Sequence, residues 1–195
     1  VGATDHGDRL IGIVHTDGSD HVLLATAEGM SIRFDENDAR VMGRAASGVK
    51  GIDLAKDDEV VGLVRVIDDA DLLTVTENGY GKRTAMEEYL VRSEGGAVRP
   101  QSRGGKGRRD IRTTERNGKV VSIRCLEFGE SVILVSIGGM LVRIPGDSIS
   151  QIGRNTMGVR LVNLKAGDTV VATAKAQEGD ESSETEVPSE QTEHA

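Results

Sequence analysis

An arginine followed four residues later by a glycine occurs three times in this chain. The copies are Arg44–Gly48, Arg103–Gly107 and Arg154–Gly158, which lie 59 and 51 residues apart. A period of this length is typical of propellers and other repeat arrays. Glycine lets the backbone approach a phosphate chain closely, and arginine neutralises phosphate charge. The motif therefore predicts a row of anion contacts, one in each repeat.

The middle copy belongs to a basic, glycine-rich loop. This loop consists of Gln101, Ser102, Arg103, Gly104, Gly105, Lys106 and Gly107, and Arg108 and Arg109 follow it. Lys106 precedes a glycine instead of Ser or Thr, so the loop is not a nucleotide-binding P-loop. No base-reading pattern stands out in it, so we expect contacts with phosphates regardless of base sequence. The alternative interpretation is a solvated basic turn without a ligand.

Two strand-like runs joined by a glycine turn precede each copy of the motif. The first runs cover residues 22–27, 72–76 and 132–136, and the turn glycines are Gly29, Gly79 and Gly139. A basic residue stands four positions after each turn glycine, namely Arg33, Arg83 and Arg143. Asn-Gly at the second turn is the strongest hairpin signal of the chain. Four short strands in each repeat are typical of a propeller blade, which predicts an all-β fold.

We divide the chain into five segments. They are an entry segment with the outer strand of a preceding blade (1–19), three blades (20–67, 68–126 and 127–177) and an acidic tail (178–195). The second blade carries an insertion of about nine residues within 91–101, beside the basic loop. The tail is rich in Glu, Ser and Thr and holds few apolar groups, so we expect it to be disordered.

The net charge of −8 is distributed unevenly along the chain. Seven acids and no Lys or Arg lie in residues 178–195, which leaves −1 for residues 1–177. Between Arg92 and Arg124, ten Lys or Arg stand against three acids, a local charge of +7. This asymmetry predicts a nucleic-acid partner. Aromatic residues make up only 2% of the chain, so stacking on single-stranded bases is not expected to dominate.

Other kinds of chemistry find little support in the sequence. Cys125 lies in an apolar run and is expected to be a buried thiol without a disulfide partner. The four histidines show no spacing typical of a metal site. No catalytic constellation stands out, and no apolar run is long enough to span a membrane. We therefore expect no catalytic residue, no metal and no membrane partner in this segment, and a free-standing enzyme is disfavoured.

Several runs together resemble one known family. The loop 101–107 resembles the glycine-rich box of bacterial DNA gyrase A subunits, and runs 76–85, 114–118 and 152–159 are similar to later blades of their C-terminal domain. The acidic tail is also similar to that family. Ser102 stands where the family has an arginine, and the loop lies in the second of three repeats, whereas the family's box lies in the first blade. The loop is therefore interpreted either as the box or as a degenerate repeat of it.

The resemblance implies a six-bladed β-pinwheel, of which this chain would hold about the last three blades. It implies that a basic rim wraps duplex DNA, so that an ATP-dependent type II topoisomerase introduces negative supercoils. The expected partners are duplex DNA, the remainder of the gyrase A polypeptide and the gyrase B polypeptide in an A2B2 heterotetramer, in the cytoplasm and on the chromosome. ATP and Mg are expected on other domains or other polypeptides of this assembly, and the strand-cleaving tyrosine on an upstream domain.

We predict the DNA-contacting residues from the repeat and from the basic stretch around the glycine-rich loop. Stacked blades bring equivalent positions onto one rim. The predicted contacts are Arg33, Arg44, Lys50, Lys82, Arg83, Arg103, Lys106, Arg108, Arg109, Arg112, Arg143, Arg154 and Arg160.

Two other functions stay open at this point. The nearer one is the corresponding C-terminal domain of topoisomerase IV, whose blades are similar but whose box is degraded. Ser102 favours this family, whereas residues 104–107 favour gyrase. The other is a β-propeller scaffold that binds proteins and not DNA.

Overall fold

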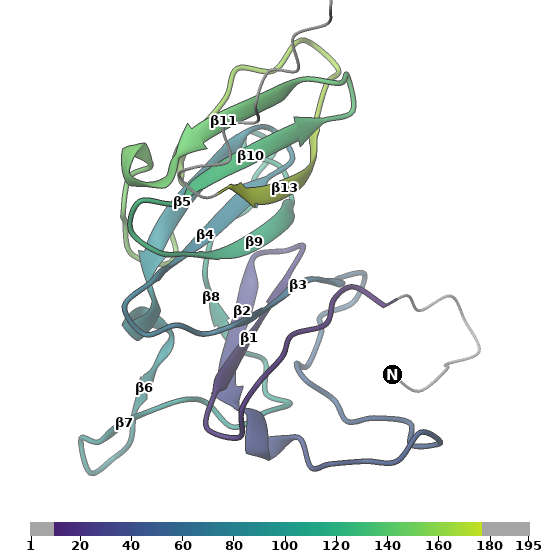
Figure 1. Cartoon of the computed structure of the whole chain (residues 1–195), viewed down its shortest axis with the longest axis vertical. Coiled ribbons are helices and arrows are strands. Elements are labelled where there is room, and N and C mark those ends of the chain that lie inside the picture. The colour runs from purple at the N-terminus through teal and green to yellow at the C-terminus, as the bar shows by residue number, and fades with distance from the viewer. Residues whose placement is uncertain (1–9, 177–195) are drawn as a thin grey trace, which may run out of the picture.

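The computed structural model describes residues 10–176, so residues 1–9 and the predicted acidic tail lie outside the described part of the chain. Its regular structure consists of short strands and three short 3-10 helices. Three larger antiparallel sheets follow one another along the long axis of the molecule (Figure 1). The all-β fold predicted from the sequence is confirmed. Within residues 10–176, no helix is long and apolar enough to cross a membrane.

The three sheets share one plan. The first sheet, in the order β3-β1-β2-β8, consists of β1 (His21–Thr26), β2 (Met30–Asp35), β3 (Val60–Arg65) and β8 (Arg108–Arg109). The second, in the order β12-β5-β4-β9, consists of β4 (Asp71–Thr76), β5 (Tyr80–Ala85), β9 (Val120–Leu126) and β12 (Val159–Arg160). The third, in the order β11-β10-β13, consists of β10 (Ser131–Ser136), β11 (Leu141–Pro145) and β13 (Val170–Ala176). A 3-10 helix follows each hairpin: η1 (Glu36–Asp38), η2 (Met86–Tyr89) and η3 (Gly146–Ser148).

The central hairpin is built alike in all three sheets. Gly29, Gly79 and Gly139 close the turns with φ of 80°, 76° and 82°, a conformation that favours glycine. The register shifts between the last two residues of β1, β4 and β10, where each strand pairs with the outer strand of its sheet. Because such a bulge bends the strand and increases its twist, the sheets curve in the same way.

The fourth strand of a sheet comes from the next repeat along the chain. β8 pairs with β2, where Arg109 lies opposite Met30. β12 pairs with β5 in the same manner, and Arg160 lies opposite Tyr80. The sequence places four strands in one repeat, but the structure builds a sheet from three strands of one repeat and one strand of the following repeat. Among the described residues, β11 has no such fourth strand.

The glycine of the repeated motif serves this strand exchange. Gly107 and Gly158 stand directly before β8 and β12, with φ of 71° and 76°. A Cβ atom on Gly158 would lie 2.7 Å from the carbonyl oxygen of Gly81, and one on Gly107 would overlap the carbonyl oxygen of Ser31. The close approach predicted toward a phosphate is therefore an approach to the acceptor strand.

Two of the three apolar clusters of the described residues lie between successive sheets, and the third belongs to the first repeat alone. Leu23 of β1 and Leu72 of β4 belong to the cluster between the first and second sheets. Leu73 of β4 and Val132 of β10 belong to the cluster between the second and third sheets. Since β4 contributes to both clusters, all six of its residues are buried. The second sheet is thus held from both sides.

The insertion predicted in the second repeat forms a small hairpin. β6 (Val91–Arg92) pairs with β7 (Val98–Arg99), and Gly96 N donates to Ser93 O across the turn. The hairpin projects from the lower part of the molecule in Figure 1. Arg92 and Arg99 of this hairpin are exposed.

Replacing the motif glycine should destabilise the fold selectively. We expect Gly107→Ala to lower the free energy of unfolding by about 1–3 kcal/mol, because alanine disfavours the positive φ and its Cβ meets Ser31. Gly105→Ala, in the same loop, is the control, since nothing lies within 3.8 Å of a Cβ there. Urea unfolding checks this, and equal midpoints for the two variants would contradict it.

Candidate nucleic-acid interface

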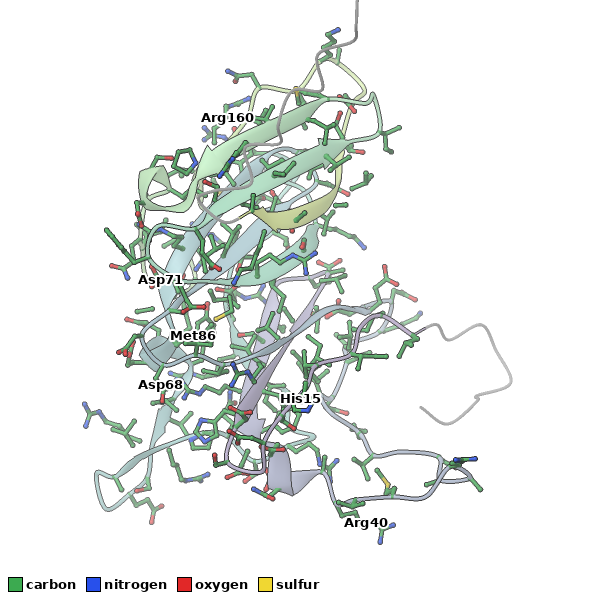
Figure 2. The ribbon with its side chains drawn as sticks, viewed as in Figure 1. His15, Arg40, Asp68, Asp71, Met86 and Arg160 are labelled. Carbon is green, nitrogen blue, oxygen red and sulfur yellow. The ribbon has the colours of Figure 1, made fainter. Side chains whose placement is uncertain are left out.

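Arg33 and Arg83 were predicted on the DNA-facing rim, but they hold successive repeats together. Arg33 is only 2% exposed, and it donates to the carbonyl of Met86 at 3.0 Å and pairs with Asp68 at 2.7 Å. Met86 and Asp68 lie close together at one side of the molecule (Figure 2). At the equivalent place on β5, Arg83 Nε donates to the carbonyl of Ile149 at 2.9 Å. The predicted rim position is therefore wrong for Arg33, because its side chain is buried where it bonds to the second repeat.

Lys82 is also internal. Its Nζ lies 3.1 Å from the Asp110 carboxylate and donates to the carbonyls of Asp110 and Gly153 at 2.9 and 3.1 Å. The hydroxyls of Thr74 and Tyr89 donate to the same carboxylate at 2.6 and 2.7 Å. Burial lowers the pKa of Lys82, and burial together with the nearby carboxylate raises the pKa of Tyr89 well above its usual range. The predicted DNA contact is wrong for Lys82, since its side chain has no exposed surface.

Arg103, the arginine of the second motif, clamps its loop to the first repeat. Its Nε donates to the carbonyl of Asp38 at 2.9 Å, and its Nη1 donates to the carbonyl of Lys50. The backbone N–H of Arg103 donates to the Asp38 carboxylate at 3.1 Å. Its guanidinium thus fixes the start of the basic loop.

Arg154 repeats this arrangement one sheet further on. Its Nη1 donates to the carbonyl of Arg109 at 3.2 Å, and its Nε lies 3.7 Å from the Glu88 carboxylate. Arg109 is the counterpart of Lys50, and Glu88 in η2 is the counterpart of Asp38 in η1. The arginines of the second and third motifs therefore join their repeats to the preceding ones.

Three other predicted contacts lie at the ends of the array. Arg44 and Lys50 belong to the first motif, and both are exposed. Lys50 pairs with Asp53 at 2.8 Å. Arg143 on β11 occupies the place of Arg33 and is exposed. Contact of these residues with DNA stays a prediction.

A group of cations lies on and beside β8. Lys106, Arg109 and Arg112 are exposed, and within residues 10–176 no ion pair joins any of them to an acid. Arg108 is half-buried and donates to the carbonyl of Leu90 at 2.8 Å. Three of the four predicted cations thus remain available to an external anion.

The segment after the motif glycine, which the second and third repeats donate to the preceding sheet, is called the donated segment. Its charge differs between the repeats. Residues three apart occupy equivalent places in it: Lys50 and Asp53, Arg109 and Arg112, Arg160 and Asn163. The first pair is an ion pair, the second consists of two exposed cations, and in the third the asparagine accepts a bond from the arginine at 3.4 Å. The pairs carry net charges of 0, +2 and +1. Positive charge is therefore concentrated in the second and third repeats.

Arg160 is joined to Tyr80 and Arg116, neither of which was predicted to contact DNA. The hydroxyl of Tyr80 accepts hydrogen bonds from Arg160 Nη2 at 2.6 Å and from Arg116 Nε at 3.1 Å. Both guanidinium groups also lie over the ring, 4.9 and 5.4 Å from its centre. The hydrogen bond from Arg116 and the charges of both arginines lower the pKa of Tyr80. Arg160 lies in the upper part of the view in Figure 2. Sequence alone gives no signal for this cluster, because it depends on the donated strand β12.

One acidic cluster has carboxylates close enough to hold a cation. Oxygens of Asp17, Asp20 and Glu36 lie within 4.8 Å of one another. Glu36 accepts the backbone N–H groups of Gly18 and Asp20 at 2.8 and 2.7 Å. The cluster is therefore explained by closure of the loop before β1.

The fold and this surface define a β-pinwheel repeat domain with basic donated strands. A family model described as "DNA gyrase C-terminal domain, beta-propeller" matches residues 20–67, 70–96, 88–127 and 130–176. The chain belongs to this family, as its resemblance to the C-terminal domain of gyrase A subunits predicted.

Individual relatives agree with the family model. The DNA gyrase A protein of Haloquadratum walsbyi is 45% identical over 179 residues, which are 91% of this chain and 20% of that protein. The DNA gyrase A protein of Salmonella typhimurium is 42% identical over 172 residues, 88% of this chain and 19% of that protein. The chain thus spans about a fifth of the length of the curated relatives it matches.

Solved structures share the architecture. A DNA gyrase A C-terminal domain matches with a TM-score of 0.71 at 26% identity, over 80% of this chain and 50% of that one. The C-terminal domain of a DNA topoisomerase IV matches with a TM-score of 0.74 over 83% of this chain and 48% of that one. At 21% identity, the second match shows the fold alone.

Arginines that bond between repeats and arginines on the exposed surface should differ in their effect on the free energy of unfolding. Arg154→Gln should lower the free energy of unfolding by about 1–3 kcal/mol, because it removes a hydrogen bond and an ion pair of a half-buried charge between repeats. Arg112→Gln, on the exposed surface, should change it by less than about 0.5 kcal/mol. Thermal or urea unfolding measures both. Equal stabilities of the two variants would contradict the clamp.

Proposed function

We propose that this chain binds duplex DNA and bends it along the exposed cations of the donated segments, as part of a gyrase A polypeptide. The observation that carries the proposal is a set of exposed cations around β8 and β12 that form no ion pair within residues 10–176: Lys106, Arg109, Arg112, Arg116 and Arg160. Family membership supports the same assignment.

Several weak contacts must act together in such a surface. Bending 20–30 base pairs by 40–90° costs about 1–6 kcal/mol. Each phosphate contact also releases counterions from the DNA. The logarithm of the binding constant therefore falls against the logarithm of the salt concentration with a slope of about 0.9 per contact. Five cations spread over two sheets supply several contacts along one path. Arg109 and Arg160 lie on the β-paired strands β8 and β12, so the backbone that carries these two cations is fixed.

In the intact protein, we propose, this segment supplies no catalytic group. It delivers a bent DNA segment to an ATP-dependent type II topoisomerase that introduces negative supercoils, together with the gyrase B polypeptide in an A2B2 assembly. ATP and Mg would bind to other parts of that assembly. The names of the sequence relatives support this role. A cytoplasmic, chromosome-associated location follows from the proposed DNA partner.

The topoisomerase IV alternative has weaker support. The matching topoisomerase IV domain has the higher TM-score of the two structures but lower sequence identity, 21% against 26%. Sequence relatives with 45% and 42% identity are gyrase A proteins. We therefore assign the chain to gyrase.

Charge removal from the donated segment should weaken duplex binding. In the triple variant Lys106→Gln, Arg109→Gln, Arg112→Gln, the slope of log K against log salt should fall by up to about 3, because each lost phosphate contact removes about 0.9. Fluorescence anisotropy with a labelled duplex, at several salt concentrations, measures this slope.

A control variant that loses the same number of charges tests whether the position of the cations matters for DNA binding. Arg65→Gln, Lys165→Gln, Lys175→Gln removes three cations from elsewhere on the surface, two of which form ion pairs with acids. This control should keep most of the affinity and slope. Equal losses in the two triple variants would contradict the proposed surface. Failure of the unaltered chain to bind duplex at low salt would reject DNA binding and favour the protein scaffold.

A further inference from the structure

We propose that Tyr80, Arg116 and Arg160 form a preorganised site for one phosphate group, supplied in this protein by the DNA backbone. The inference rests on the proposed function and deepens it, since it names a fixed anchoring point on a surface otherwise described only by its charge. It also gives a tyrosine a positioning role in DNA binding.

The geometry brings two positive charges to one buried aromatic side chain. Tyr80 is 4% exposed, whereas Arg116 and Arg160 are both exposed. Each arginine donates to the tyrosine hydroxyl and stacks over its ring. Stacking of this kind attracts a cation without neutralising its charge. The guanidinium groups are therefore held in place and remain positive.

The backbone that carries each arginine is held in place by strand pairing or by hydrogen bonds. Arg160 lies on β12, which is paired with β5 directly opposite Tyr80. The loop that carries Arg116 is bound to the hairpin turn, because Asn78 Nδ2 donates to the carbonyls of Glu115 and Arg116 at 3.1 and 3.3 Å. The two guanidinium groups come from different repeats and meet on a residue of the second sheet.

Hydrogen-bond donors are left over at this cluster. Within residues 10–176, neither arginine forms an ion pair with a carboxylate, and Tyr80 acts only as an acceptor in its bonds to them. The phenolic proton and the remaining guanidinium N–H groups can donate to the oxygens of an anion. Arginine forks match phosphate oxygens in geometry as well as in charge. A phosphate group fits this set of donors.

The other repeats show that the fold does not require the cluster. The residues equivalent to Tyr80, directly after the turn glycine, are Met30 and Met140. Arg109 lies opposite Met30, and within residues 10–176 its guanidinium is not stacked on an aromatic ring. The same strand pairing is thus made with methionine, so the tyrosine and its two arginines are an addition to the repeat.

A variant that leaves net charge unchanged tests the site. Tyr80→Met introduces the residue that the first and third repeats use, and both arginines remain. We expect duplex binding to weaken about twofold to tenfold, because two long side chains must then be ordered at binding. Tyr80→Phe, which keeps the ring and removes the hydroxyl, should give an intermediate loss. Thermal unfolding of both variants shows whether the fold is kept.

A double-mutant cycle separates a positioning role from a general structural one. In the background Arg116→Gln, Arg160→Gln, the change Tyr80→Met should have no further effect on duplex affinity, because the tyrosine acts through the arginines. A loss of the same size in both backgrounds would overturn the proposal.

The two tyrosines of the chain provide a direct readout. With 3-fluorotyrosine at positions 80 and 89, ¹⁹F NMR should give one signal for each, assigned with Tyr80→Phe. Duplex DNA should move the Tyr80 signal and raise the pKa of this residue, because a phosphate offsets the arginine charges that lower it. Inorganic phosphate is the second arm of the titration. A response to phosphate at micromolar concentration but none to duplex would indicate a free phosphate ligand and overturn the DNA assignment.

The outcomes distinguish this inference from the proposed function. If the chain binds duplex but Tyr80→Met binds equally well at every salt concentration, the site is rejected and the DNA-binding function stands. If the unaltered chain binds no duplex at low salt, the proposed function itself fails.

Discussion

Each complete four-stranded sheet in the described part of this protein depends on a strand that belongs to the next repeat. Backbone pairing of β8 with β2 and of β12 with β5 makes the connection, and the repeated arginine and glycine make it possible. The glycine permits close approach of the donated strand, and the arginine bonds back to the preceding repeat. Because backbone pairing fixes the register of β8 on β2 and of β12 on β5, the exposed side chains of these donated strands hold fixed positions on the sheets.

Cations in this protein have two separate tasks. Arg33 and Arg83 donate to carbonyl groups of the next repeat, and Lys82 bonds to Asp110 of its own repeat and to Gly153 of the next. The burial of Arg33 and Lys82 is tolerated only because these partners are present. Arg109, Arg112 and Arg160 lie on or near the outer face of the donated segments and are exposed. A repeated basic residue therefore indicates function only where its neighbours leave the charge accessible.

The hairpins could be predicted from the sequence, because turn glycines and β-rich runs are local signals. The burial of Arg33 and Lys82 could not, since their partners Met86 and Asp110 lie 53 and 28 residues away. The cluster at Tyr80 was missed for the same reason, as Arg160 is 80 residues distant. Recurrence in the sequence correctly marked important positions, but it did not separate contacts between repeats from contacts with a ligand.

Energy transfer between the two labelled ends of a duplex measures whether cations on the donated segments bend DNA. We expect high transfer with the unaltered chain at low salt, and low transfer with the triple variant Arg109→Gln, Arg112→Gln, Arg160→Gln at protein concentrations that saturate the duplex. A duplex that is bound but stays straight, or that this variant bends equally well, would contradict bending by these cations.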